Sequence, residues 1–198
     1  MISFVNTDSE QLSPHGTLLL SIMQALVDMP ARVSVRETQG ESSSFFEVWV
    51  HPSDYGIALG KDGIVFEAVR SVMAVVGVAS ERNVQLSLLI NRKPSTDSLT
   101  PVTPLSVDGL VALLETVVKA MVAQPERARV IHTPCKHLHV YEIEVPPCYV
   151  GTVLGRAGRT INALRLIVRA IAGKLRQPIH LHLIESVWSS QPNKREAA

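Results

Sequence analysis

The sequence has few aromatic residues and little cysteine, and it contains no long hydrophobic run. Aromatic residues make up 5 % of the 198 residues and hydrophobic residues 46 %, so any core must be mainly aliphatic. Two cysteines, Cys135 and Cys148, are too few for a disulfide framework. No apolar run approaches the roughly 20 residues of a membrane span, and the first residues lack the pattern of a signal peptide. These absences predict a cytoplasmic protein with free thiols and no membrane partner.

The net charge of +1 conceals two halves of opposite sign. Residues 1–97 hold 7 Lys and Arg against 11 Asp and Glu, whereas residues 98–198 hold 12 against 7. Clustered positive charge attracts polyanions. The second half is therefore the candidate for a polyanionic partner, unless its charges only solvate the surface.

The chain contains a gapless internal repeat at an offset of 95 residues. Its proline and glycine positions coincide: Pro30 with Pro125, Pro52 with Pro147, Gly56 with Gly151, Gly60 with Gly155, and Gly63 with Gly158. Shared glycines and prolines arise by chance much less often than shared apolar residues. The pattern predicts a duplicated module.

The boundary between the copies follows from composition. Prolines at 94, 101 and 104 stand among Ser, Thr and Asp, a mixture that cannot hold a helix or a central strand. We therefore predict a first module over residues 1–92, a linker over 93–106, a second module over 107–188 and a disordered tail over 189–198.

Each copy predicts the same order of elements, α-β-β-α-α-β. A first helix begins at Ser13-Pro14 and at Asp108, and it stops before the repeated proline. Strands follow at about 32–37 and 45–51, and at 127–132 and 139–145, joined by turns at Gln39-Gly40 and Pro134-Cys135. A short helical turn and a long helix (63–76 and 158–172) precede a last alternating strand. This order predicts an α+β fold in which each module is a three-stranded sheet with helices on one face.

Each long helix is preceded by two glycines three residues apart. The pairs are Gly60-Lys61-Asp62-Gly63 and Gly155-Arg156-Ala157-Gly158, each with a basic residue after the first glycine. Glycine allows a tight turn and close approach of another backbone. The start of a helix offers unpaired N–H groups and the positive end of its dipole. The pattern therefore predicts an anion site.

The helix–Gly-x-x-Gly–helix element in this strand order resembles the KH domain, and more closely the small bacterial KH-domain RNA-binding family called KhpA. Residues 51–63 (HPSDYGIALGKDG) fit that family's run, and residues 146–161 fit its second part. Tyr149 departs from it, because the family usually has Asp there, and the tandem form is a second departure. The resemblance implies two KH-type modules whose loops clamp about four nucleotides of single-stranded RNA, in an RNA chaperone or post-transcriptional regulator.

The two copies of the motif differ in charge, which predicts that the second module is the stronger RNA binder. Asp62 places a carboxylate in the first loop, where the second has Ala157. Arg159, Arg165 and Arg169 continue along one arc of the second long helix, opposite an apolar arc. The alternative interpretation is that these arginines only keep the outer face of the helix soluble. The predicted RNA-binding residues are Gly155, Arg156, Ala157, Gly158, Arg159, Arg165 and Arg169, with Gly60, Lys61, Asp62 and Gly63 in the first module.

No catalytic constellation emerges, so we expect no enzyme, no cofactor and no metal site. Cys135, His137 and His139 alternate and could form a metal site with His132 or Cys148. The first copy has Gly40, Ser42 and Ser44 at the equivalent positions, however, which favours ordinary turn and strand surface.

The second hypothesis for function is a protein-interaction module, in which the duplication encodes a fused pseudo-dimer with one or both loops inactive. Its partner would be another KH-domain or RNA-associated protein.

Overall fold

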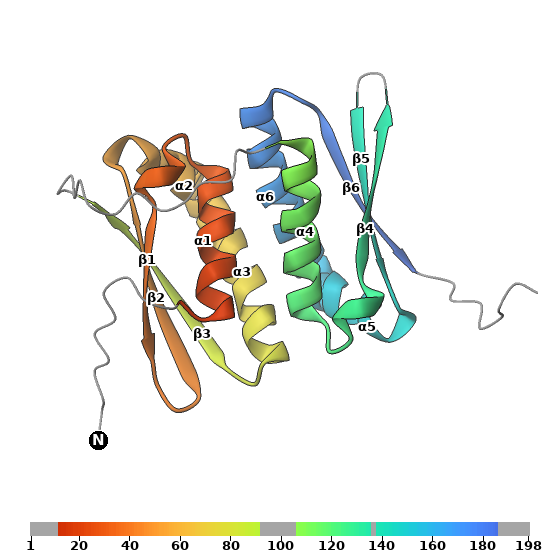
Figure 1. Ribbon diagram of the computed structural model, residues 1–198, viewed down its shortest axis with the longest axis horizontal. Helices are drawn as coiled ribbons and strands as arrows, with labels where there is room; N and C mark the ends of the chain where they lie inside the picture. Colours follow the sequence, from red (N-terminus) through yellow and green to blue (C-terminus); the bar gives the residue numbers. More distant parts are fainter. Residues whose placement is uncertain (1–11, 92–105, 136–137, 186–198) are drawn as a thin grey trace, which may run out of the picture.

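The computed structural model describes residues 12–91, 106–135 and 138–185 (Figure 1). Module one comprises α1 (Pro14–Leu26), β1 (Ser34–Gln39), β2 (Ser43–Val50), α2 (Tyr55–Leu59), α3 (Ile64–Ala79) and β3 (Asn83–Ile90). Module two comprises α4 (Val107–Met121), β4 (Arg129–Cys135), β5 (Leu138–Val145), α5 (Pro147–Leu154), α6 (Arg159–Leu175) and β6 (Ile179–Glu185). The predicted α+β class and the order α-β-β-α-α-β are confirmed.

Serine caps the first helix of each module. Ser13 accepts a hydrogen bond from the Gly16 N–H, and Pro14 occupies the first helical position. In module two the cap is Ser106, which accepts from the Gly109 N–H at 3.0 Å. The predicted start at Asp108 was therefore wrong, because Ser106 supplies the capping oxygen and Asp108 falls in the first turn. Ser106 thus belongs with α4, while the rest of the predicted linker and the tail lie outside the described residues.

Several strand and helix ends differ from prediction for local reasons. Three-residue 3-10 turns, η1 (Pro30–Arg32) and η4 (Pro125–Arg127), occupy the predicted strand starts, so β1 and β4 begin two residues later. Strand β4 continues through Pro134 and Cys135, which the pattern had assigned to a turn. Proline is tolerated there because β4 is an edge strand. Helices α3 and α6 each extend three residues further than predicted.

Each module has a three-stranded sheet covered by helices on one face. The strand orders are β1-β2-β3 and β4-β5-β6, with the first pair antiparallel and the second parallel. Alternate residues of the central strands point into the core; Val48 and Ile143, for example, are fully buried. The two sheets lie on the outside of the molecule and the helices lie between them (Figure 1).

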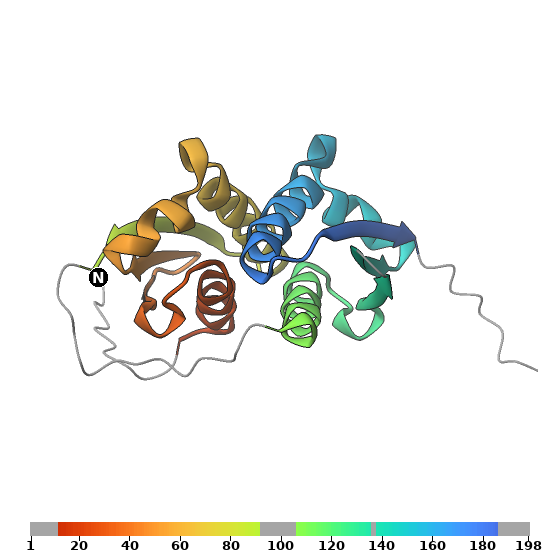
Figure 2. The same ribbon diagram turned by 90° about the horizontal axis from the view of Figure 1, so that it is seen from above.

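The helices of the two modules pack against each other, so the buried residues form one continuous core. Val72 on α3, Leu110 on α4 and Ile171 on α6 are fully buried and line one small apolar cavity between the modules. Figure 1 shows α3 and α6 running antiparallel, and Figure 2 shows the modules related by an approximate two-fold rotation, with α1 and α4 on one side and α3 and α6 on the other. The Nζ of Lys174 also donates a hydrogen bond to the Val27 carbonyl at the end of α1. The duplication has therefore produced a single body built as a pseudo-dimer.

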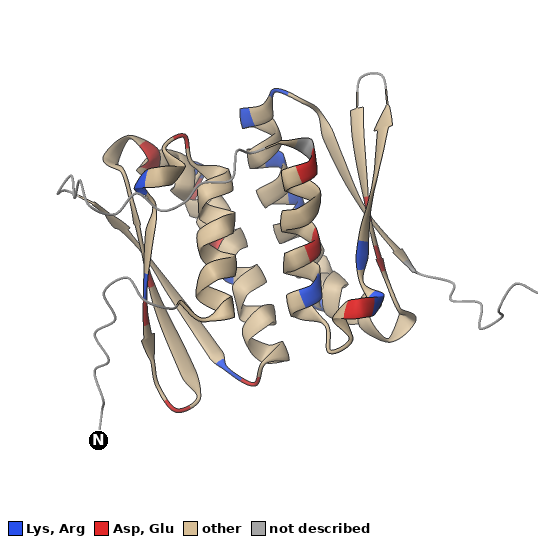
Figure 3. Cartoon of the chain, in the orientation of Figure 1, with Lys and Arg blue, Asp and Glu red and all other residues tan. Residues whose placement is uncertain are grey.

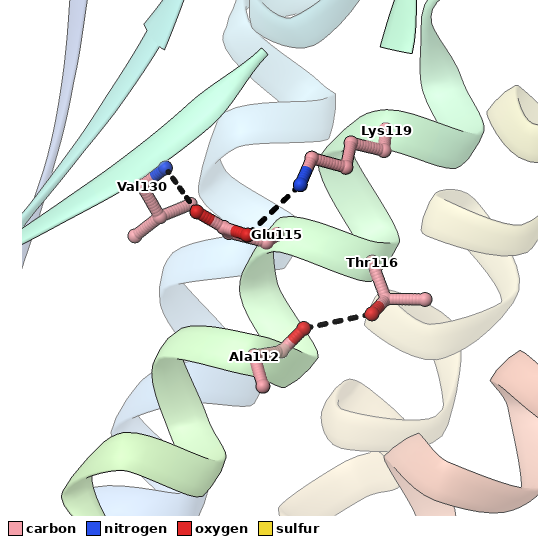
Figure 4. A network of polar contacts seen from close by, with 5 residues as sticks. All are labelled: Ala112, Glu115, Thr116, Lys119 and Val130. Carbon is pink, nitrogen blue, oxygen red and sulfur yellow. Dashed lines mark hydrogen bonds and ion pairs between the residues drawn. The ribbon is translucent and has the colours of Figure 1, made fainter. Parts of the chain in front are cut away.

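A glutamate ties the first helix to the sheet in each module. In module one Glu37 on β1 accepts a hydrogen bond from the Ser13 N–H at 3.0 Å. In module two Glu115 on α4 accepts from the Val130 N–H on β4 at 3.3 Å and pairs with Lys119 at 2.9 Å (Figure 4). The hydrogen bond from Lys119 lowers the pKa of Glu115, and the Val130 N–H acts in the same direction against partial burial.

No helix in the described part of the chain is long and apolar enough to cross a membrane.

Candidate nucleic-acid interface

Two loops, each joining a short helix to a long one, have nearly identical backbones. Loop one (Gly60–Gly63) connects α2 to α3, and loop two (Gly155–Gly158) connects α5 to α6. In each loop the first, third and fourth residues have positive φ, at 75°, 54° and 81° in loop one and at 73°, 56° and 72° in loop two. Three such residues in four turn the chain sharply where the long helix begins.

The first glycine of each loop cannot be replaced without strain. Gly60 and Gly155 combine φ near 75° with ψ near 170°, a region that is essentially restricted to glycine. A Cβ on Gly60 would lie 2.4 Å from the Val65 side chain, and one on Gly155 would lie 2.1 Å from the Thr160 hydroxyl. Both glycines are therefore required for conformation and for space.

The third residue of each loop adopts the left-handed conformation without being glycine. Aspartate tolerates this region better than alanine does, because its side chain can bond locally. Asp62 therefore carries less backbone strain than Ala157, although it adds a negative charge. Strained residues of this kind cluster at functional sites.

The ends of α3 and α6 at these loops are open to solvent and to a ligand. Gly63 and Gly158 stand at the cap positions, and neither helix has a side-chain cap. Lys61 and Asp62 are exposed in loop one, and Arg156 and Ala157 are exposed in loop two. Backbone N–H groups and a basic side chain at an uncapped helix start are groups that suit a phosphate. Loop one differs from loop two in carrying the carboxylate of Asp62 where loop two has Ala157.

The predicted arginines on α6 are all exposed, but they differ in their contacts. Arg159 and Arg169 face solvent, whereas the Nε of Arg165 donates to the Leu181 carbonyl on β6 at 3.2 Å and its Nη1 donates to Asn162. Arg165 therefore fastens α6 to the sheet as well as presenting charge. The apolar arc predicted opposite these residues is buried.

The equivalent arginine of module one is neutralised. Arg70 pairs with Glu67 at 2.6 Å and reaches the Leu86 carbonyl at 3.4 Å. Asn162 replaces that glutamate in module two, so Arg165 keeps a net positive charge. About two turns along α6 from loop two there is thus an arginine without a carboxylate partner among the described residues, and at the same place on α3 an arginine that is paired.

The sequence did not predict the hydrogen bond that holds the turn before α2 in module one. Asp54 is 2 % exposed, and its carboxylate accepts a hydrogen bond from the Met29 N–H at 2.9 Å. This bond fastens the turn before α2 to the segment that follows α1. Asp54 stood in the family pattern, but no local signal assigned it a partner 25 residues away. Tyr149 holds the equivalent position in module two and is half-buried.

The four described histidines of module two lie in two pairs. His132 and His139 share a hydrogen bond of 2.8 Å and stack with ring centroids 5.1 Å apart. His180 and His182 stack on the outer face of β6. In the described part of the chain no three metal-ligating residues come together, and His137 lies outside that part.

The fold and the loops define the class of protein. A helix–Gly-x-x-Gly–helix unit packed on a three-stranded sheet of this topology is a KH-type module, and the chain contains two. The family model of the KhpA/KhpB KH domain matches residues 17–88 and again residues 111–183. The chain belongs to this family.

Individual relatives match one module at a time. Over 72 residues the chain is 36 % identical to the RNA-binding protein KhpA of Clostridium acetobutylicum and 39 % identical to that of Chlamydia caviae. Each match covers 36 % of this chain, but 96 % and 90 % of the respective relatives. Among solved structures, the crystal structure of APE1850 aligns over 86 % of this chain and 95 % of its own, with a TM-score of 0.30 and 16 % identity.

Proposed function

We propose that the chain binds single-stranded RNA through its Gly-x-x-Gly loops, as an RNA chaperone or post-transcriptional regulator, with module two supplying most of the affinity. The observation that carries the proposal is loop two, where an uncapped helix start meets an exposed Arg156 and no acidic side chain. Its relatives in the KhpA/KhpB family are named as RNA-binding proteins. In KH modules such a loop grips the backbone of about four nucleotides.

The charges near each loop support the inequality of the modules. Asp62 and the paired Glu67 oppose phosphate at loop one, whereas Arg159 and Asn162 stand near loop two. A carboxylate about 4 Å from a phosphate costs on the order of 1–4 kcal/mol near a protein surface. Loop one therefore binds RNA weakly or serves only as a support.

A second candidate function is protein binding by loop one. Its flanking residues Ile57 and Ile64 are 40 % and 49 % exposed, and the equivalents in module two are Thr152 and Arg159. An apolar, acidic surface of this kind fits a basic protein segment better than it fits RNA. Binding of a protein partner that survives loss of loop two would favour this function.

The test compares matched charge reversals in the two loops. Binding of a labelled five-nucleotide RNA is measured at several salt concentrations for the wild type, Lys61→Asp and Arg156→Asp. We expect Arg156→Asp to weaken binding at least tenfold and to reduce its salt dependence, and Lys61→Asp to change it much less. Equal binding by all three proteins, or no RNA binding by the wild type, would refute the loop as the RNA site.

A further inference from the structure

Equivalent positions on and just after α3 and α6 differ in charge. The α6 row, defined as Arg165, Arg169 and Arg176, is exposed along the helix and at its end. The equivalent residues of module one are Arg70, Ala74 and Glu81. Figure 3 shows basic residues recurring along α6. Among the described residues no carboxylate lies within ion-pair distance of Arg169 or Arg176, so the row presents free positive charge well beyond loop two.

The row leads away from loop two, along α6 to its C-terminal end. Because α3 and α6 are antiparallel, loops one and two lie at opposite ends of this helix pair (Figure 1). The last turn of α6 reaches α1 through the bond from Lys174 to the Val27 carbonyl. Two residues later the Met29 N–H donates to Asp54, in the turn before α2. The C-terminal end of α6, where the row ends, therefore lies at the same end of the helix pair as loop one (Figure 1).

We infer that an RNA strand held in loop two continues along the α6 row and crosses the module boundary to reach loop one. This inference rests on the proposed function and extends it to a longer ligand. The 17 residues of α6 span about 25 Å, since each residue of an α-helix rises about 1.5 Å. At a stacked spacing of about 3.4 Å, that length takes about seven nucleotides beyond the roughly four in the loop.

The approximate two-fold relation explains why loop one does not act as a second identical clamp for that strand. A two-fold rotation reverses the direction of any line perpendicular to its axis. A strand that runs on from loop two along this face therefore enters loop one in the opposite sense to its path through loop two. Loop one then contributes the charge of Lys61 rather than the same four-nucleotide grip, which makes Asp62 tolerable there.

The test uses the full chain with two unstructured RNAs of the same composition, five and sixteen nucleotides long. The variant Arg169→Gln/Arg176→Gln removes two exposed charges from the row. The matched control is Arg129→Gln, which removes an exposed arginine from β4, where it pairs with Glu144. Affinity is measured as a function of salt concentration for each protein and each RNA.

For the sixteen-nucleotide RNA we expect the slope of log K against log salt to fall by about 1.4, because each lost phosphate contact on a single strand contributes about 0.7. We expect a smaller fall for the five-nucleotide RNA, because it fills loop two and reaches less of the row, and no change for the control. Lys61→Ala should weaken only the longer RNA. If the double variant weakens both RNAs equally, or neither, or if the wild type binds both equally well, the path along α6 is wrong. Loss of five-nucleotide binding in Arg156→Asp tests loop two separately, so failure of the path and failure of the proposed function are distinguishable.

Discussion

The two modules share a backbone and differ in chemistry. Their loops agree within 10° in φ at the three positive-φ positions. In both loops a Cβ on the first glycine would collide with the side chain at the same position of the long helix, Val65 or Thr160. The side chains between and after those glycines diverge from Asp62 to Ala157, from Ile64 to Arg159 and from Glu67 to Asn162. Duplication has kept the element that requires glycine and has changed the charge around it, so the two copies can take different roles without a change of fold.

The largest expected effect concerns whether the modules are separate units at all. Val72→Asp would bury an unpaired charge among residues of both modules, which costs about 3–5 kcal/mol. Because the core is shared, hydrogen exchange should show β5 of module two losing protection together with β2 of module one. Loss confined to module one would mean that the modules fold independently.

The next comparison tests whether the two loops depend equally on their first glycine. Gly60→Ala and Gly155→Ala each force a Cβ into a neighbouring side chain in a conformation that alanine avoids. We expect each to reduce the free energy of unfolding by about 2–4 kcal/mol in urea denaturation. Gly56→Ala and Gly151→Ala are matched controls with open space at the Cβ, and helix propensity should make them neutral or stabilising by up to about 1 kcal/mol. A mild effect at Gly155 alone would show that loop two can rearrange.

Changing the third loop residue of each module towards that of the other should reduce the difference in RNA affinity between the modules. Ala157→Asp places a carboxylate in loop two, and Asp62→Asn removes one from loop one while keeping a side chain that tolerates positive φ. We expect the first change to weaken binding of a short RNA about tenfold, or ~1.4 kcal/mol, and the second to strengthen binding by a smaller factor. Titration of labelled RNA measures both. No change in Ala157→Asp would argue against phosphate passing through loop two.

The smallest expected effect concerns the glutamate that ties α4 to β4. The pKa of Glu115 is lowered in the folded protein, so its contribution to stability is fully present above its ordinary pKa of about 4.5 and is lost as the pH falls through the folded value. Glu115→Gln should therefore flatten the loss of stability below about pH 4.5, measured by thermal unfolding across pH. Lys119→Gln should have the same effect, since Lys119 is the main cause of the shift. If both variants lose stability at low pH as the wild type does, other carboxylates are responsible for that loss.

The sequence by itself determined the duplication, the order of elements and the position of both loops. These depend on local requirements that residue types reveal: glycine at positive φ, serine and proline at helix starts, and apolar residues at helical or alternating spacing. The same local requirements predicted the ends of helices and strands less accurately. Proline continues β4 because that strand lies at a sheet edge, and an edge is a property of strand order rather than of the tripeptide around Pro134.

Only the tertiary structure decided how the modules meet and what supports each loop. The bond from Lys174 to Val27 joins residues 147 positions apart, and the partner of Asp54 lies on a different element. Apolar residues on α3 and α6 indicate burial, but they carry no information about which surface covers them. That choice depends on the shapes of two complete helix faces, which the pattern of either helix alone does not specify. The antiparallel packing of α3 and α6, and with it the direction in which the α6 row points, therefore arises from long-range complementarity.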